Sequence, residues 1–176
     1  MANKSRRRVK MVRAIEKSIM HPDIYGTINY RRMNEAQIKQ YMHRYLLDCV
    51  SSLYKDDKKC NEDTSIKFAK SAVLWEGNVK TTINNLIFMG TQHRPDMVVE
   101  FPKYRIGIEV KKGNAGGVVR EGIGQSIVYS TVFDFVICLV VDTSNDKKIL
   151  NSVKSDKERQ VVKSLWNEYN ISFNVI

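Results

Sequence analysis

The sequence lacks the features of disulfide-bonded and membrane-spanning proteins. Its 176 residues include only three cysteines and three prolines. The cysteines (Cys49, Cys60 and Cys138) are odd in number and far apart, which argues against a disulfide framework and a zinc knuckle. No apolar run approaches the ~20 residues of a membrane span, and no signal-peptide core follows the basic N-terminus. We therefore expect an intracellular protein without membrane contact.

Acidic residues are also scarce relative to basic ones. The chain has 29 Lys and Arg against 19 Asp and Glu, a formal net charge of +10, while 43% of its residues are hydrophobic. The hydrophobic content is that of a folded domain. The positive charge favours a polyanionic partner, because phosphate contacts release counterions. We therefore expect a nucleic acid as the partner.

Residues 1–33 form a basic N-terminal arm. Val9, Val12, Ile15 and Ile19 recur at helical spacing, which predicts a basic amphipathic helix over 9–20. The arm is either a nucleic-acid contact or a solvated tail. If it binds nucleic acid, the contacting residues are Arg6, Arg7, Arg8, Lys10 and Arg13.

The remainder, 34–176, is predicted to be one domain. Asn34 and Gln37 form a capping-box pattern before an amphipathic helix over 35–54. The polar segment 55–63 is predicted to be a loop, and 66–74 fits either a short helix or a strand. A strand is expected near 86–89.

The pattern becomes more regular after residue 94. The β-rich runs 97–101 and 104–110 are separated only by Pro102 and Lys103, which predicts a tight hairpin. A helix over 118–131 and an apolar strand over 133–141 predict a crossover between parallel strands. A helix over 156–169 and a strand over 171–176 complete the chain. The fold class is α/β, a mixed sheet flanked by helices.

Two carboxylates are expected to meet across that hairpin. If Pro102 and Lys103 are its central turn residues, the register places Asp96 opposite Glu109. Lys111 lies two residues beyond Glu109 and projects from the same face. Such a pair can hold Mg²⁺, which polarises a phosphoryl oxygen and acidifies a bound water. The ammonium either orients that water or stabilises developing charge, so the set suits phosphodiester hydrolysis. Alternatively, Glu109 and Lys111 are the exposed face of a strand whose other face holds Ile108 and Val110.

These residues resemble a known family signature. Arg94-Pro95-Asp96 followed by Ile108-Glu109-Val110-Lys111 resembles the PD…ExK motif of the PD-(D/E)xK, or restriction-endonuclease-like, nucleases. The predicted element order is similar to the αβββαβ core of that superfamily, and the resemblance covers about 35–142. Gln125 and Tyr129 match the QxxxY motif of its RecB-like and Cas4-like branches. They share one helix face, so both are expected beside the metal.

The resemblance implies one more ligand on the first helix. Glu35 is our first choice as the third metal ligand beside Asp96 and Glu109, with Glu62, Glu76 and His43 as alternatives. His93 is close in sequence to Asp96. Cas4-like relatives also carry an iron–sulfur cluster, but three scattered cysteines cannot supply its four ligands, so none is expected.

The resemblance therefore implies a Mg²⁺- or Mn²⁺-dependent deoxyribonuclease, with DNA as the expected partner and RNA as the lesser alternative. The expected catalytic residues are Asp96, Glu109, Lys111, Gln125, Tyr129 and Glu35. The alternative is a non-catalytic nucleic-acid-binding protein of the same fold. The QxxxY resemblance favours a RecB-like exonuclease, end-processing or single-strand nuclease, with a structure-specific endonuclease as the alternative. A monomer and a homodimer both stay open.

Overall fold

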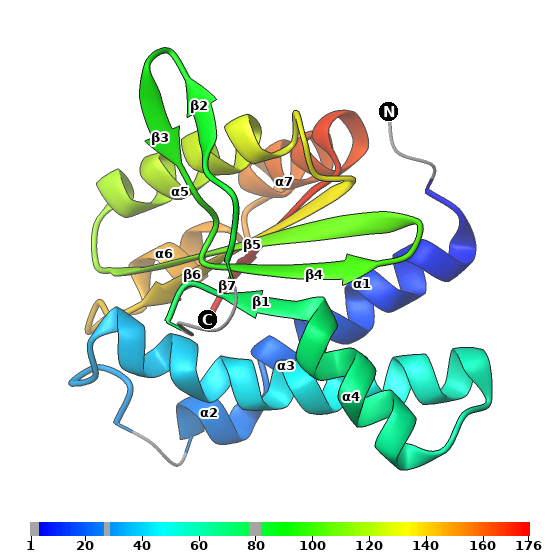
Figure 1. Cartoon of the computed structure of the whole chain (residues 1–176). Helices are drawn as coiled ribbons and strands as arrows, with labels where there is room; N and C mark the ends of the chain where they lie inside the picture. Colours follow the sequence, from blue (N-terminus) through cyan, green and yellow to red (C-terminus); the bar gives the residue numbers. More distant parts are fainter. Residues whose placement is uncertain (1–3, 27–28, 78–81) are drawn as a thin grey trace. The chain divides into compact units, whose positions relative to one another are not determined.

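The computed structural model describes residues 4–26, 29–77 and 82–176 (Figure 1). The chain is α/β, with flanking helices and a mixed five-stranded sheet in the order β1-β4-β5-β6-β7, as the sequence predicts. It divides into two compact units, which are described separately. We call Asn3–Ile83 with Met97–Lys103 the helical unit, and Asn84–Asp96 with Tyr104–Ile176 the parallel-strand unit.

The helical unit packs helices around a short antiparallel strand pair. Helix α3 contacts both α1 and α4, and β1 pairs with β4 so that Val73 lies opposite Val99. The elements are α1 (Arg6–Ile19), α2 (Pro22–Gly26), α3 (Glu35–Lys58), α4 (Glu62–Ala72), β1 (Val73–Trp75) and β4 (Met97–Phe101).

Helix α1 is a packed element of this unit. Ser5 caps it by accepting a hydrogen bond from the Arg8 N–H, and Val12, Ile15 and Ile19 are fully buried. The predicted helix over 9–20 is therefore confirmed, with a start three residues earlier. Its apolar face is buried, which contradicts the alternative of a wholly solvated tail.

Helix α3 has the predicted capping box, with reciprocal hydrogen bonds between Asn34 and Gln37. The predicted loop over 55–63 is wrong in its first part, because α3 continues to Lys58. Lys59, with a φ of 50°, ends the helix in the left-handed region. The segment 66–74 proves to contain both alternatives, since α4 runs directly into β1.

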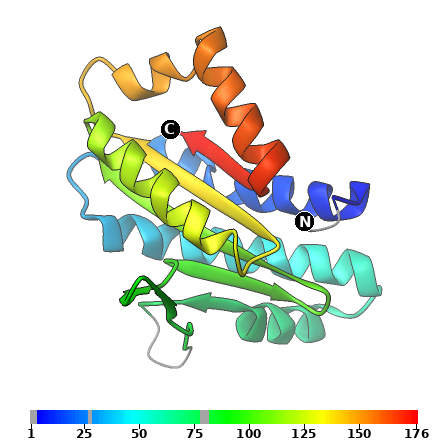
Figure 2. The same ribbon diagram turned by 90° about the horizontal axis from the view of Figure 1, so that it is seen from above.

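The parallel-strand unit holds three parallel strands and the helices that cover them. Strand β5 pairs with β6, and β6 with β7, both in parallel, so the predicted crossover through a helix is confirmed. Figure 2 shows α5 lying along β5 and β6, and α7 beside β7. The elements are β2 (Leu86–Phe88), β3 (Thr91–His93), β5 (Tyr104–Gly113), α5 (Gly116–Tyr129), β6 (Phe135–Asp142), α6 (Lys148–Ser152), α7 (Asp156–Tyr169) and β7 (Ile171–Val175).

The apolar pattern predicted the buried strands better than the short elements. All eight residues of β6 are buried, as its continuous apolar sequence indicates. The predicted bounds of α7 are correct, whereas β3 and α6 were not predicted because each is too short for periodicity to show. No helix within 4–26, 29–77 and 82–176 is long and apolar enough to cross a membrane.

Candidate functional site

Asp96 and Glu109 are two buried carboxylates of the parallel-strand unit. Asp96 is 7% exposed and Glu109 is 2% exposed. The Val110 N–H donates a 2.7 Å hydrogen bond to Asp96 Oδ2, so the Asp96 carboxylate lies against β5 next to Glu109. Burial of a carboxylate costs free energy unless charge or hydrogen bonds offset it. The alternative of an exposed Glu109 on a polar strand face is therefore wrong, because both faces of β5 are covered at this position.

Lys111 connects this pair to helix α5. Its Nζ lies 3.0 Å from Glu109 Oε1 and 2.8 Å from Glu121 Oε1. Burial lowers the pKa of Lys111, but the hydrogen bond to Glu121 and the charge of Glu109 outweigh that effect, so its pKa lies above the usual value. These contacts favour the charged ammonium form of Lys111.

Glu121 was not among the residues that the sequence singled out. It lies four residues before Gln125, which in turn lies four residues before Tyr129, so the three share one face of α5. Glu121 contacts Lys111 at one end of this face. At the other end the Tyr129 hydroxyl donates a 2.9 Å hydrogen bond to the carbonyl of Arg94, two residues before Asp96. The face therefore extends from Lys111 to the segment that carries Asp96.

Gln125 lies in the middle of that face. Its Oε1 is buried and accepts no hydrogen bond from the part of the chain that the structure describes. A buried acceptor of this kind needs an explanation, such as a water, an ion or a substrate donor. Gln125 lies one helical turn from both Glu121 and Tyr129 on this face. Its place beside Asp96 and Glu109 stays a prediction.

A glycine and a cysteine allow α5 to approach the strands closely. A Cβ on Gly122 would lie 3.1 Å from Cys138 Sγ and 3.3 Å from Lys111 Cγ, so a larger residue would push the helix away. The pKa of the Cys138 thiol is raised to about 12, mainly by burial and also by the charges of Glu109 and Asp96, while a hydrogen bond with Ser126 and the charge of Lys111 lower it. Cys138 therefore stays a neutral thiol and packs beneath the charged cluster.

The donor atoms of this cluster suit a hard divalent cation. Among Asp96, Glu109, Glu121 and Lys111, three carboxylates accompany one ammonium. Mg²⁺ is commonly held by one or two carboxylates together with waters and substrate phosphate oxygens. No group of three or more His, Cys, Asp or Glu side chains suited to a metal occurs within 4–26, 29–77 and 82–176. Asp96 and Glu109 would supply the carboxylates of such a site, with water and substrate as the other ligands.

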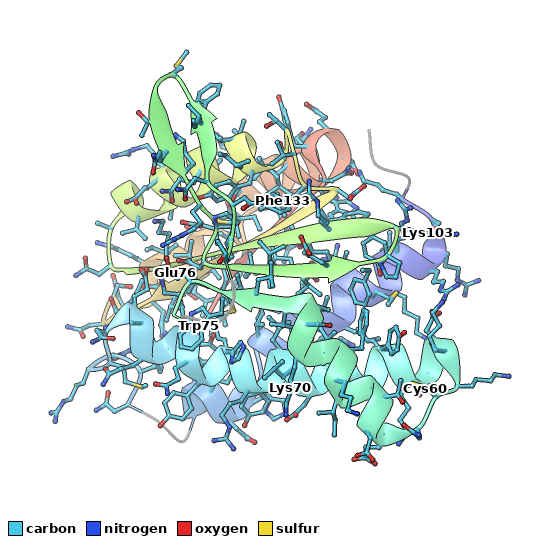
Figure 3. All side chains as sticks on the ribbon, in the orientation of Figure 1. Cys60, Lys70, Trp75, Glu76, Lys103 and Phe133 are labelled. Carbon is cyan, nitrogen blue, oxygen red and sulfur yellow. The ribbon has the colours of Figure 1, made fainter. Side chains whose placement is uncertain are left out.

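The other candidate ligands lie apart from this cluster in the chain. Glu35 belongs to the helical unit, where Lys39 Nζ lies 3.4 Å from Glu35 Oε1 and 2.7 Å from Glu76 Oε1. Figure 3 labels Glu76 beside Trp75, at the end of β1. The assignment of Glu35 as a third metal ligand stays a prediction.

The remaining alternatives have structural contacts of their own. His43 packs against Trp75 with 5.0 Å between ring centroids, and burial lowers its pKa. Glu62 is an exposed partner of Lys55. His93 packs against Phe88, with 6.3 Å between ring centroids.

The basic residues of α1 separate into paired and solvated groups. Arg7 forms an ion pair with Asp57, and Arg13 Nη1 lies 2.7 Å from Glu16 Oε2. Arg8 donates a hydrogen bond to the carbonyl of Lys103. Exposed positions recur at intervals of three and four residues, which gives α1 a cationic stripe opposite its buried face. The stripe comprises Arg6, Lys10, Arg13 and Lys17.

Comparison with known proteins adds no relative. No family model, no curated protein and no solved structure matches the chain.

The Tyr129 hydrogen bond gives a first testable result. Tyr129→Phe should lower the free energy of unfolding by about 1 kcal/mol, because a buried hydrogen bond to the Arg94 carbonyl is removed. Urea denaturation would measure the change. Tyr169→Phe, on an exposed ring of α7, is the control and should have no effect. Equal stability of Tyr129→Phe and the wild type would contradict an anchoring role.

Proposed function

We propose that the protein is a divalent-metal-dependent nuclease that hydrolyses DNA phosphodiester bonds, as the resemblance to PD-(D/E)xK enzymes implies. The observation that carries this proposal is the buried carboxylate pair of Asp96 and Glu109, with Lys111 held at 3.0 Å from Glu109. Function depends on such side chains rather than on the fold alone.

The chemistry divides between a cation and the residues of the chain. Mg²⁺ or Mn²⁺ held by Asp96 and Glu109 would polarise a phosphoryl oxygen and acidify a bound water. Lys111, as a fixed cation, stabilises the negative charge that develops on the phosphate. Glu109 of β5 and Glu121 of α5 both hold its ammonium in place. Gln125 presents a buried amide to the substrate, and Tyr129 positions the segment that carries Asp96.

Incubation with labelled DNA tests this function. Single-stranded, duplex and branched substrates are incubated with Mg²⁺, with Mn²⁺ or with EDTA. We expect shortened products with a metal and none in EDTA. Equal cleavage in EDTA would contradict the proposal, whereas binding of DNA without cleavage under any metal would favour the non-catalytic alternative.

The cationic stripe of α1 supports DNA as the partner. A variant with Arg6, Lys10 and Lys17 changed to Gln should bind DNA more weakly. It should also reduce the slope of log affinity against log salt by up to about 0.9 for each phosphate that the variant no longer neutralises. Fluorescence anisotropy at several salt concentrations measures both quantities. The side chains are exposed, so the melting temperature should be unchanged.

The control for this variant removes the same charge elsewhere. Lys148, Lys157 and Lys163 are exposed lysines of α6 and α7, and their change to Gln should alter the salt slope less. Equal slopes for the two triple variants would show that the α1 stripe contributes only its net charge. The part of residues 1–33 that forms α1 should not be deleted for this test, because its buried face belongs to the core.

A further inference from the structure

The β2–β3 hairpin carries an exposed apolar tip. Leu86 pairs with His93 and Phe88 with Thr91, so Met89 and Gly90 form the two-residue turn. Ile87 is 77% exposed, Phe88 46% and Met89 88%. Three consecutive large apolar side chains in water are unfavourable, and such a patch usually marks a binding surface.

The turn itself favours a different residue from the one present. Met89 has a φ of 49° and Gly90 a φ of 73°, the left-handed conformations of a tight hairpin turn. Asn or Asp is the usual first residue of such a turn, because a long side chain is disfavoured at positive φ. Met89 therefore destabilises the hairpin in two ways, through its left-handed backbone conformation and through the exposure of its apolar side chain.

The hairpin stands directly before the candidate cation site in the chain. Asp96 follows β3 by three residues, and the Tyr129 hydroxyl fixes the Arg94 carbonyl between them. Figure 1 shows the hairpin projecting away from α5 and the parallel strands. At ~3.3 Å for each strand residue, the four steps from Gly90 to Arg94 span roughly 13 Å. That length corresponds to about four base steps of DNA.

The surroundings of the tip fit DNA. The segment 84–95 contains no Asp or Glu, and it carries Arg94 together with exposed Asn, Thr and Gln side chains. Polar and basic groups of this kind can contact phosphates, whereas apolar side chains inserted between base steps unstack them. Within 84–93, neither strand of the hairpin packs extensively on another helix or strand, and two of the three residues of each strand are exposed.

We propose that Ile87, Phe88 and Met89 form a wedge that unstacks DNA bases next to the candidate cation site. This inference rests on the proposed function and deepens it, because a wedge of this kind suits duplex ends and branched DNA rather than a continuous single strand. The wedge opens the duplex within a few nucleotides of Asp96, and the separated strand then reaches Lys111 and Gln125.

The test reports base unstacking without any chemistry. Forked DNA with 2-aminopurine at the junction is mixed with the protein in EDTA, and its fluorescence rises when the base loses its stacking partners. The test variant combines Ile87→Thr, Phe88→Thr and Met89→Asn, which keep strand-forming residues and suit the turn. The control is Val161→Thr, which changes a half-exposed apolar residue of α7.

The wild type and the control should raise the fluorescence severalfold, and the triple variant should lose most of that rise. Its affinity, measured by anisotropy on the same DNA, should fall by no more than about tenfold, which corresponds to ~1.4 kcal/mol. The triple variant should also cut forked DNA more slowly than single-stranded DNA, relative to the wild type.

The outcomes of these measurements distinguish the wedge proposal from the proposed nuclease activity. A fluorescence rise in EDTA together with no cleavage in Mg²⁺ would support the wedge and refute the proposed activity. No rise in wild-type protein bound to the fork, or the same rise in the triple variant, would overturn the wedge and leave the activity untouched. If the triple variant differs from the wild type only in its oligomeric state in solution, the tip contacts a second copy of the chain, and the wedge proposal is overturned.

Discussion

Asp96→Asn and Glu109→Gln are each expected to lower the rate of DNA cleavage by about 100-fold or more. Each change keeps the shape of the side chain but removes a charge that the proposed cation needs, and a loss of about 3 kcal/mol in transition-state stabilisation corresponds to that factor. Single-turnover cleavage of labelled DNA in Mg²⁺ measures the effect. The rate should not recover at higher DNA concentration, because the loss lies in the chemical step.

Two further measurements separate this effect from damage to the fold. Each amide keeps an oxygen that can accept the hydrogen bond of the carboxylate it replaces, so both variants should stay folded at the assay temperature. Glu100→Gln changes an exposed carboxylate of β4 and should cut DNA at the wild-type rate. Undiminished cleavage by Asp96→Asn would refute the assignment, and so would its unfolding at the assay temperature.

Asp142→Ala is expected to give the largest loss of stability, about 3 kcal/mol or more. The Asp142 carboxylate is fully buried and accepts hydrogen bonds from the main-chain N–H groups of Ser144, Ile149 and Leu150. It also accepts a hydrogen bond from the Ser144 hydroxyl. Its removal leaves buried N–H donors at the start of α6 without an acceptor. The free-energy cost of these unpaired donors exceeds the stabilisation that the hydrogen bonds contribute. Urea denaturation at neutral pH measures the loss.

The pH dependence of stability should reveal the same carboxylate. Burial raises the pKa of Asp142, but the hydrogen bonds from Ser144, Leu150 and Ile149 outweigh it, so the pKa in the folded protein lies below 3.8. A lowered pKa stabilises the folded state above pH ~3.8 and loses that contribution as the pH falls through the folded value. The wild type should therefore lose more stability than Asp142→Ala on acidification below pH ~4.

Asp146→Asn is the matched control, because Asp146 is an exposed carboxylate of the same loop. It should change the free energy of unfolding by less than about 0.5 kcal/mol. Equal stability of Asp142→Ala and Asp146→Asn would contradict the proposed anchoring of α6.

Much of the fold could be predicted because the sequence carries strong local signals. The capping box of Asn34 and Gln37 fixed the start of α3, and the apolar run of β6 indicated a strand covered on both faces. The end of α3 was not predictable, because Lys55–Lys58 is polar and helix termination depended on a left-handed Lys59. Short elements such as β3 and α6 are stabilised by tertiary contacts, which the periodicity of apolar residues does not reveal.

The candidate site was predictable only in part for a related reason. Asp96, Glu109 and Lys111 stand in a recognisable spacing, and all three lie close to Cys138. The burial of Glu109 could not be read from the alternation of β5, because alternation also describes a strand with one exposed face. Glu121 was not predicted as a site residue, because exposed glutamates are common on helices. Only its place one turn before Gln125, on the same face, could have indicated its contact with Lys111.

Titration of Mn²⁺ into the protein by calorimetry tests most directly whether Asp96 and Glu109 form a cation site. The wild type, with a short uncleavable DNA analogue present to supply phosphate oxygens, should bind the metal at a site that Asp96→Asn weakens strongly and Glu100→Gln leaves unchanged. Lys111→Met should retain the metal while losing cleavage, because the ammonium stabilises charge and is no ligand. Metal binding of equal strength in the wild type and in Asp96→Asn, or no binding in either, would contradict the proposed site.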